Sequence, residues 1–212
     1  MTLRLAPKAA SGKPPPMDFA RQIMSGVTPD MICLAKSIGG GLPLAAFLAH
    51  KSVMDLISQH KVFHGGTYNT NPVSMAAGLA TFREVLTRDN YAQVDKLGKK
   101  LADGYRKTIA KVGLQAYIAQ AGANGALMFY PKEIRNYRDW TTIDIDLWRH
   151  YWFAMVNRGV MAQPYWWDEQ WTISVQHTEA DIDKHLSAFA DIAASLAKAQ
   201  QERVGQPVLA AH

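Results

Sequence analysis

Apolar residues recur at intervals of three and four along five stretches of the chain, a spacing that places them on one side of an α-helix. The stretches predicted as helices are residues 52–60, 72–86, 91–112, 145–157 and 178–199. In the second stretch, the apolar side is expected to be buried, and it consists of Met75, Leu79, Phe82 and Leu86. In the third, an apolar side lies opposite a run of lysines and arginines, which is most simply a solvated surface.

Short apolar runs bounded by turn residues predict strands. These runs are residues 31–35, 44–49, 114–119, 125–130, 160–162 and 171–175. The run from Met31 to Ala35 is nearly continuous and follows a Pro-Asp turn signal, which is typical of a strand that is buried on both faces. Cys33, the single cysteine, lies in this run and is expected to be a small buried hydrophobe, so neither a disulfide nor a metal site is predicted.

The order of these elements predicts two domains. Residues 26–86 alternate short strands with helices, and residues 87–200 place two strands after a long helix, which predicts an α+β domain. Residues 1–25 have the proline-rich composition of a linker, with a short helix over residues 17–24. Residues 201–212 are expected to be a frayed tail.

Lys36 stands at the end of the first strand, and the glycine run Gly39 to Gly41 begins three residues later. Removing a lysine from water favours its neutral, nucleophilic amine, which suits a Schiff base. Because glycine has no Cβ atom, the backbone of this run can approach a flat ligand or another chain closely. Taken alone, the same residues also fit an exposed lysine followed by a flexible turn.

A polar, glycine-containing loop spans residues 63–72 and leads into the second predicted helix. Asn71 is placed to cap this helix, and Pro72 to occupy its first position. Loops of this composition at the start of a helix present N–H groups and a hydroxyl group to an anion. A phosphate group is the expected ligand.

These two motifs, in this order, resemble those of the class III pyridoxal-phosphate (PLP)-dependent aminotransferases, most closely the glutamate-1-semialdehyde aminomutase branch. The matching residues are Thr28-Pro-Asp-Met-Ile-Cys-Leu-Ala-Lys-Ser-Ile-Gly-Gly-Gly-Leu-Pro and Gly66-Thr67-x-x-x-Asn71-Pro72-x-x-x-Ala76-Ala77-Gly78. The resemblance extends from about Gly26 to near Lys198 and corresponds to the C-terminal half of such an enzyme. It implies an α/β fold, with a partial large domain of the aspartate-aminotransferase type over residues 26–86 and a small α+β domain after it.

The resemblance also implies roles for individual residues. Lys36 would form the internal aldimine with PLP and would move a proton during the reaction. Gly66 and Thr67 would bind the cofactor phosphate of the neighbouring subunit in a homodimer. Glu169 lies near the position of an active-site glutamate in the aminomutase branch, which would place it at the substrate.

Three functions are compatible with these residues. The resemblance implies transfer or intramolecular shift of an amino group on a small amino acid, oxo acid or semialdehyde. The second function is that of a truncated, inactive fragment that acts at most through association with another chain, since the family's aspartate for the pyridine nitrogen and its own-subunit phosphate loop are expected before Met1. The third is a basic module for anionic metabolites, which would bind phosphate at Gly66 and Thr67 without an imine at Lys36.

The formal net charge of +5 and the isoelectric point near 9.3 raise the question of a nucleic-acid partner. The basic residues are spread over amphipathic helices and form no single stripe, so no nucleic-acid partner is expected. No apolar run is long enough to span a bilayer and no secretory leader is recognisable, so a cytoplasmic protein without a membrane partner is expected.

A loop is predicted over residues 163–170, and the next strand begins at residue 171. This stretch contains three of the six tryptophans, close in sequence to Asp168 and Glu169. An aromatic surface of this kind needs a partner, which the sequence leaves open among a substrate, a second subunit and another part of the domain. His64 and His177 also lie in predicted loops. A histidine in a loop either contacts a cofactor or substrate or has a structural role.

Overall fold

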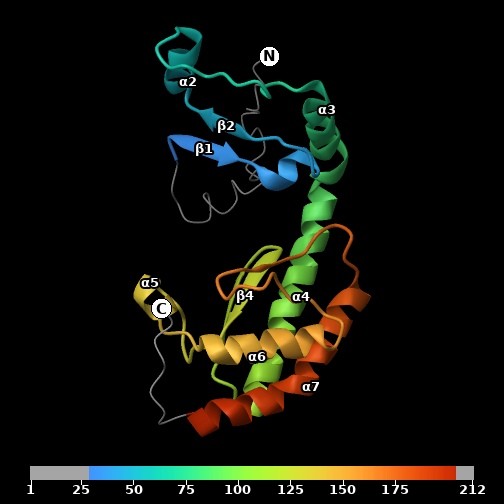
Figure 1. The fold of residues 1–212 in the computed structure, drawn as a ribbon. Coiled ribbons are helices and arrows are strands. Elements are labelled where there is room, and N and C mark those ends of the chain that lie inside the picture. Colours follow the sequence, from blue (N-terminus) through green and yellow to red (C-terminus); the bar gives the residue numbers. More distant parts are fainter. Residues whose placement is uncertain (1–28, 204–212) are drawn as a thin grey trace. The chain divides into compact units, whose positions relative to one another are not determined.

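The computed structural model describes residues 29–203, which form two compact units (Figure 1). Unit 1 is the part up to Tyr91, and unit 2 is the part from Ala92 onwards. The linker predicted over residues 1–25, with its helix, and residues 204–212 of the predicted tail lie outside the described residues. None of the helices between residues 29 and 203 combines the length and the apolar character that crossing a membrane requires.

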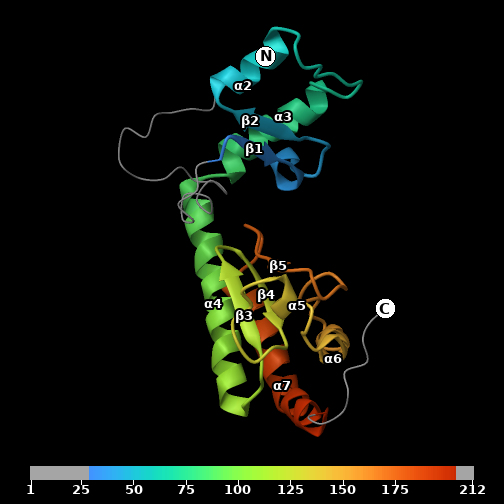
Figure 2. The same cartoon turned by 90° about the vertical axis from the view of Figure 1, so that its left-hand side faces the viewer.

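Unit 1 contains a two-stranded antiparallel ribbon and several short helices (Figure 2). Strand β1 (Met31–Leu34) pairs with β2 (Ala46–Ala49), so that Met31 lies opposite Ala49. The helical elements of this unit are η1 (Lys36–Gly39), α2 (Lys51–Ser58), α3 (Pro72–Ala80) and η2 (Thr81–Val85). The last of them, η2, is a π-helical turn that continues α3, so together they match the helix predicted over residues 72–86.

The prediction that the first strand is buried on both faces is wrong. Met31 is 47% exposed, and Cys33 is exposed as well, in contrast to the buried cysteine that we expected. Each strand of the ribbon has one partner strand, and α2 contacts only β2 closely among the described elements. Two strands cannot enclose a hydrophobic core by themselves, so β1 remains largely open to solvent.

The most buried side of α3 is displaced by one residue from the predicted side, of which Met75, Phe82 and Leu86 are half-buried. Ser74, Gly78 and Thr81 are buried along the α3–η2 segment. Leu79 belongs to the predicted apolar side but is 49% exposed. Small side chains allow this helix to lie close against the turn after β1, and that close approach decides which side is covered.

Unit 2 contains a three-stranded antiparallel sheet with the order β3-β4-β5, packed against long helices (Figure 1). Its elements are α4 (Arg88–Val112), which begins in unit 1, β3 (Tyr117–Ala121), β4 (Asn124–Met128), α5 (Tyr137–Trp140), α6 (Ile145–Val156), β5 (Trp171–Thr172) and α7 (Glu179–Arg203). Residues 160–162, predicted as a strand, form none. Helix α7 continues to Arg203, so the first residues of the predicted frayed tail are helical.

Side chains cap the starts of α6 and α7. Asp144 Oδ1 accepts a hydrogen bond of 2.8 Å from the Leu147 N–H. Before α7, the Thr178 N–H donates to Asp181 Oδ2 at 2.8 Å, and the Asp181 N–H donates back to Thr178 Oγ1 at 3.3 Å. Each cap satisfies a backbone donor that the helix itself leaves free, and such caps typically stabilise a helix by about 1 kcal/mol.

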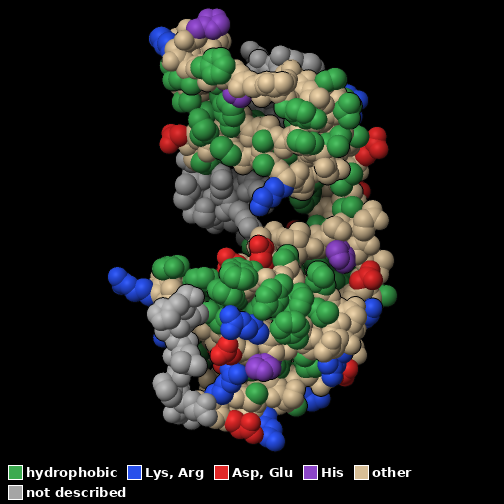
Figure 3. Space-filling model, in the orientation of Figure 1, with side chains coloured by type: hydrophobic (Ala, Val, Ile, Leu, Met, Phe, Trp, Pro, Cys, Tyr) green, Lys and Arg blue, Asp and Glu red, His purple; other side chains and the backbone are tan. Residues whose placement is uncertain are grey.

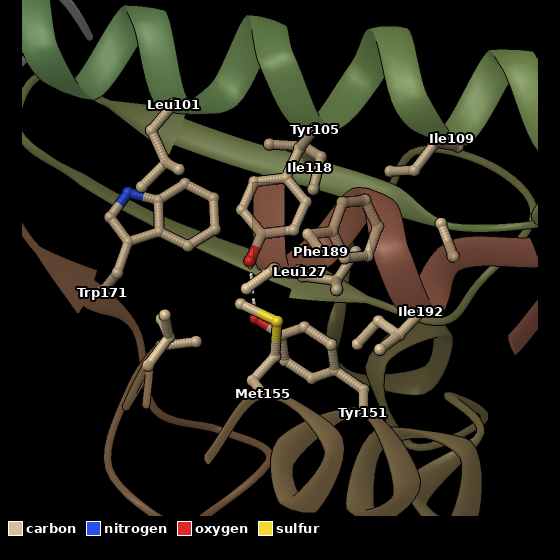
Figure 4. Packing of buried hydrophobic residues seen from close by; sticks show 14 of the residues in the cluster. Leu101, Tyr105, Ile109, Ile118, Leu127, Tyr151, Met155, Trp171, Phe189 and Ile192 are labelled. Atoms are coloured by element: carbon tan, nitrogen blue, oxygen red, sulfur yellow. Dashed lines mark hydrogen bonds between the residues drawn. The ribbon is translucent and has the colours of Figure 1, made fainter. Parts of the chain in front are cut away.

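The core of unit 2 is centred on Tyr105 of α4 (Figure 4). The predicted apolar side of this helix is buried throughout, and it consists of Val94, Leu97, Leu101, Tyr105 and Ile109. The Tyr105 ring stacks on Trp171 with 5.5 Å between ring centroids and lies 4.3 Å from the Phe189 ring. Its hydroxyl is hydrogen-bonded at 2.6 Å to the Tyr151 hydroxyl and at 2.6 Å to Nε2 of His185. Burial raises the pKa of both tyrosines, so both remain protonated.

The neutral form of His185 is expected to stabilise unit 2 in a pH-dependent way. Burial, together with the positive charge of His177, lowers the pKa of His185 from 6.5 to about 4. A histidine whose pKa is lower in the folded state stabilises the fold above its unfolded pKa, and this contribution is lost as the pH falls from 6.5 towards 4. The lowered pKa corresponds to a loss of about 2 to 3 kcal/mol in the free energy of unfolding between pH 7 and pH 4.5.

Denaturant unfolding at pH 7 and pH 4.5, followed by tryptophan fluorescence, tests this expectation. All six tryptophans lie in unit 2, so the signal reports on this unit alone. His185→Gln is expected to remove most of the pH dependence, whereas the exposed His150→Gln is expected to retain it. Asp103 and Glu179, whose pKa values are lowered by hydrogen-bonded lysines, lose their contribution only at lower pH. An unchanged pH dependence in His185→Gln would contradict the assignment.

Candidate functional site

Lys36 is held at a sharp change of backbone direction. Strand β1 ends at Leu34, and Lys36 is the first residue of η1. Its φ angle of 57° lies in the left-handed region, which is uncommon for residues other than glycine and costs about 1 kcal/mol or more. Gly40 and Gly41, with φ angles of 57° and 97°, then continue the turn at little cost. The Lys36 side chain is exposed at the end of the strand, so the burial expected for it is not present in the described structure.

The turn after Lys36 is fixed by close packing against the α3–η2 segment. A Cβ atom at Gly78 would lie 2.4 Å from Leu44 Cδ2, and a Cβ atom at Gly40 would lie 2.9 Å from Thr81 Oγ1. Ile38, between Lys36 and these contacts, is only 6% exposed. The backbone beneath Lys36 is therefore held by a helix that is distant from it in the sequence.

A valine at position 78 is expected to loosen this turn. The added side chain must displace Leu44, and overpacking of this kind costs about 1 to 3 kcal/mol even though valine forms helices slightly better than glycine. Amide hydrogen exchange in residues 36–44 should become faster in Gly78→Val. Ala76→Val, on the exposed side of the same helix, should leave the exchange unchanged, and equal exchange in both variants would contradict the packing argument.

Gly66 and Thr67 lie in the exposed loop that leads into α3. The Asn69 N–H donates to the Gly66 carbonyl at 3.0 Å, which makes a turn over these residues. Asn71 caps α3 as predicted, because its Oδ1 accepts hydrogen bonds from the N–H groups of Val73 and Ser74. The first donors of the helix are therefore already used. Donors for an anion remain in the loop itself, namely the backbone N–H groups of Gly66 and Thr67 and the Thr67 hydroxyl.

An apolar hollow of about 170 Å³ lies between the ribbon and α2 in unit 1. Its lining residues are Met31, Phe47, Val53, Met54, Leu56, Ile57, Val62, Phe63 and His64. The ring of His64 meets the Phe47 ring edge-on with 5.1 Å between centroids, so this histidine has a packing role. Lys36, Gly66 and Thr67 are not part of the lining, which means that the described hollow does not gather the predicted site residues.

Glu169 belongs to unit 2, whereas the other predicted site residues belong to unit 1. Its carboxylate is exposed, and its backbone N–H donates to the Trp166 carbonyl at 3.1 Å. Its carbonyl accepts a hydrogen bond from Nε2 of Gln163 at 2.9 Å. The sequence did not reveal this role of Gln163, because a single glutamine in a polar loop carries no distinctive pattern. The roles of Lys36, Gly66, Thr67 and Glu169 stay predictions.

Comparison with known proteins identifies a family and close relatives. The family model for Aminotransferase class-III matches residues 12–190. The chain is 37% identical over 168 residues to the glutamate-1-semialdehyde 2,1-aminomutase of Desulfatibacillum aliphaticivorans, and 36% identical over 168 residues to that of Akkermansia muciniphila. Each alignment covers 79% of this chain and 39% of the relative. The chain thus spans about two fifths of the length of these curated relatives.

Solved structures with the same fold support the predicted fold class. A glutamate-1-semialdehyde aminomutase from Pseudomonas aeruginosa PAO1, in complex with PMP, is similar with a TM-score of 0.73 and 23% identity, over 83% of this chain and 41% of that one. An omega-transaminase from Sphaerobacter thermophilus is similar with a TM-score of 0.70 and 24% identity, over 84% of this chain and 41% of that one. The prediction of a partial fold of the PLP-dependent aminotransferase type is confirmed.

Proposed function

Because this chain belongs to the class-III aminotransferase family, we propose that it carries part of a PLP-dependent site for amino-group transfer, with Lys36 as the residue that binds the cofactor. The reaction is either a transamination or a 2,1-shift of the kind named for its relatives. The substrate class is a small amino acid, oxo acid or semialdehyde. A cytoplasmic location is part of the same proposal.

The observation that carries this proposal is the position of Lys36. Its exposed amine stands on a left-handed residue directly after a strand, and packing against α3 fixes the turn beneath it. Backbone strain that the surrounding structure maintains is concentrated at functional sites. A lysine that only kept the surface polar would not need this conformation.

The described residues of unit 1 match two needs of a PLP group. The aldehyde of PLP needs a primary amine, which Lys36 offers at its Nζ. The phosphate of the PLP in a neighbouring subunit needs hydrogen-bond donors, which the exposed loop offers at Gly66, Thr67 and the Thr67 hydroxyl. When bound, PLP supplies an electron-poor ring that stabilises negative charge on the substrate carbon.

Each residue has a defined task in the proposed reaction. Lys36 holds the cofactor, and its Nζ takes the proton from the substrate Cα and returns it to a neighbouring atom. Gly66 and Thr67 hold the phosphate belonging to a neighbouring subunit, so the proposed assembly is a homodimer. Glu169 places a carboxylate at the substrate.

The exposed apolar side chains of unit 1 favour a second candidate function, in which the chain associates with another chain without catalysing the reaction itself. Phe63 is 91% exposed, Val73 64% and Tyr68 61%. Large apolar side chains exposed together mark interaction surfaces in soluble proteins.

Reductive labelling of the chain with PLP tests the proposal. After incubation with PLP, borohydride makes the bond to the amine permanent, and peptide mass mapping locates the pyridoxyl group. We expect the label on the peptide that contains Lys36. Label distributed evenly over the surface lysines, or none, would overturn the assignment. Label at Lys36 without turnover of glutamate-1-semialdehyde or of amino donors would favour the second candidate.

A further inference from the structure

We propose that Tyr105 of α4 is a redox-active tyrosine, which gives one electron to an organic peroxyl radical at the surface of unit 2 and passes its phenolic proton to His185 of α7. The product is a tyrosyl radical inside the core of unit 2, which lasts until a reductant returns the electron. This inference goes beyond the proposed function and does not depend on it, because neither Lys36 nor PLP takes part.

Tyr105 belongs to a chain of three hydrogen-bonded side chains inside unit 2. Its hydroxyl oxygen is 2.6 Å from the Tyr151 hydroxyl oxygen on α6 and 2.6 Å from Nε2 of His185 on α7. Figure 4 shows the two tyrosines pointing toward each other across the core. Both tyrosines are fully buried, and both distances are at the short end of the usual range. A proton therefore has only a short distance to travel between the Tyr105 oxygen and Nε2 of His185.

The burial of Tyr151 fixes the direction of this chain. Within residues 29–203, the Tyr151 hydroxyl has no hydrogen-bond partner other than Tyr105. If His185 donated to Tyr105, one of the two buried hydroxyl protons would have no acceptor, which is costly. In the direction that satisfies both hydroxyls, Tyr151 donates to Tyr105, and Tyr105 donates to Nε2 of His185.

The protonation states of the chain suit a coupled transfer of one electron and one proton. Burial raises the pKa of Tyr105 and of Tyr151, so neither hydroxyl loses a proton by itself. Burial, together with His177, lowers the pKa of His185 to about 4, so the imidazole is neutral at pH 7 and can accept a proton. An oxidised phenol is a much stronger acid than a phenol. Loss of an electron from the Tyr105 ring therefore drives its proton to His185.

Atoms and electrons balance in this step. The O–H bond of Tyr105 breaks, and an N–H bond forms on His185, which becomes an imidazolium ion. The electron passes to the peroxyl radical, which takes up a proton from solvent and becomes a hydroperoxide. A one-electron reductant such as ascorbate later returns an electron to the Tyr105 oxygen, and the proton moves back from His185.

Aromatic rings connect Tyr105 to the surface of unit 2. Tyr165 is 43% exposed, and its ring lies 5.8 Å from the buried Trp148 ring between centroids. Trp148 and Tyr151 are three residues apart on α6, which places them on the same side of this helix. Tyr151 then contacts Tyr105 through the hydrogen bond between their hydroxyls. Figure 3 shows hydrophobic side chains gathered on the face of unit 2 over α6, and apolar radicals favour such a surface.

Two indole N–H groups of unit 2 explain why the oxidation stops at Tyr105. Trp148 and Trp171 are 1% and 3% exposed, and Nε1 of each has no hydrogen-bond partner within residues 29–203. An oxidised indole at either place has no base for its proton, so it keeps a positive charge in an apolar core, which is costly. Trp171 stacks on the Tyr105 ring at 5.5 Å between centroids, so an electron from Tyr105 can neutralise it. Of these three rings, Tyr105 is the one with a base at its polar atom.

Flash oxidation of the full chain without PLP tests this proposal. A photogenerated ruthenium(III) tris-bipyridyl ion removes one electron from the surface rings, and rapid-freeze EPR detects the radical. We expect a long-lived tyrosyl radical in the parent and its loss in Tyr105→Phe, which keeps the ring but removes the hydroxyl. Tyr137→Phe, at a tyrosine that is 73% exposed, is the matched control and should retain the radical. The same long-lived signal in Tyr105→Phe would overturn the proposal.

His185→Gln separates proton acceptance from packing. The glutamine amide still offers an oxygen to the Tyr105 hydroxyl, but it does not take up a proton. Radical formation should become slower by about 10²-fold, as expected when a positioned base is lost, whereas the exposed His150→Gln should behave as the parent does. Denaturant unfolding at pH 7 establishes that each variant is folded. A folded His185→Gln that forms the radical at the parent rate would show that His185 is not the base.

Two measurements on the parent chain test the proposal without any substitution. High-field EPR reports whether the radical oxygen accepts a hydrogen bond, as it must from the protonated His185, and a radical without this bond would overturn the proposal. Mass mapping locates permanent oxidation, and damage confined to exposed rings with no long-lived radical would also overturn it. Because every measurement is made without PLP, failure here leaves the labelling result at Lys36 unaffected.

Discussion

Replacement of Lys36 by alanine is expected to abolish the lasting attachment of PLP to this chain, whereas replacement of Lys51 is expected to leave it intact. Both amines are exposed and lie in unit 1, so a nonspecific reaction would modify both. Only Lys36 stands on the left-handed turn that α3 holds in place. Lys51 is on the surface of α2, where it pairs with Asp55.

The measurement is the visible absorbance of each variant after incubation with PLP and dialysis. The parent and Lys51→Ala should retain the absorbance, and Lys36→Ala should lose it. Where turnover is detectable in the parent, Lys36→Ala should lower the rate by about 10²- to 10⁴-fold or more, because the proton-transferring amine is also lost. Absorbance retained in Lys36→Ala would show that another amine binds the cofactor.

Gly125→Ala is expected to destabilise unit 2 strongly. A Cβ atom at this position on β4 would lie 2.2 Å from Cζ2 of Trp171 and 2.7 Å from the Ala119 carbonyl oxygen. Neither atom can move easily, because Trp171 is 3% exposed and stacked on Tyr105, while Ala119 is paired in the sheet. We expect a loss of about 3 kcal/mol in unfolding free energy, although alanine at a tolerant site would stabilise a strand.

Gly104→Ala is the matched control for this prediction. Its Cβ atom would also be close to a neighbour, at 2.4 Å, but that neighbour is the flexible end of Leu186. The side chain can rotate away, and alanine also favours the helix by about 1 kcal/mol. Denaturant unfolding followed by tryptophan fluorescence should therefore show a much smaller effect for Gly104→Ala. Equal losses in the two variants would contradict the distinction between fixed and flexible neighbours.

The long helices of unit 2 could be predicted because their signals are local. The apolar spacing of α4 and the capping residues Asp144, Thr178 and Asp181 act over a few positions of the chain, and the folded unit buries the same side that the spacing indicates. In unit 1 the same kind of argument failed for β1. Its apolar run predicted burial, but burial requires other elements to cover the strand, and only β2 pairs with it among the described residues.

Some features of the candidate site could be predicted from the sequence, and others could not. The motif around Lys36 and the loop with Gly66 and Thr67 could be located from residue types and spacing, and so could the helix cap at Asn71. The left-handed conformation of Lys36 has no such signal in the residue types around it.

By itself, the sequence determined the family and the helices whose periodicity and caps are complete, and the role of Lys36 stays a prediction. Only the tertiary structure decided which side of α3 is buried and that the Gln163 side chain is hydrogen-bonded to the Glu169 carbonyl. The physical reason is that helix periodicity and capping depend on neighbours a few residues away. Burial, strain and loop closure depend on contacts between residues that the folded chain brings together.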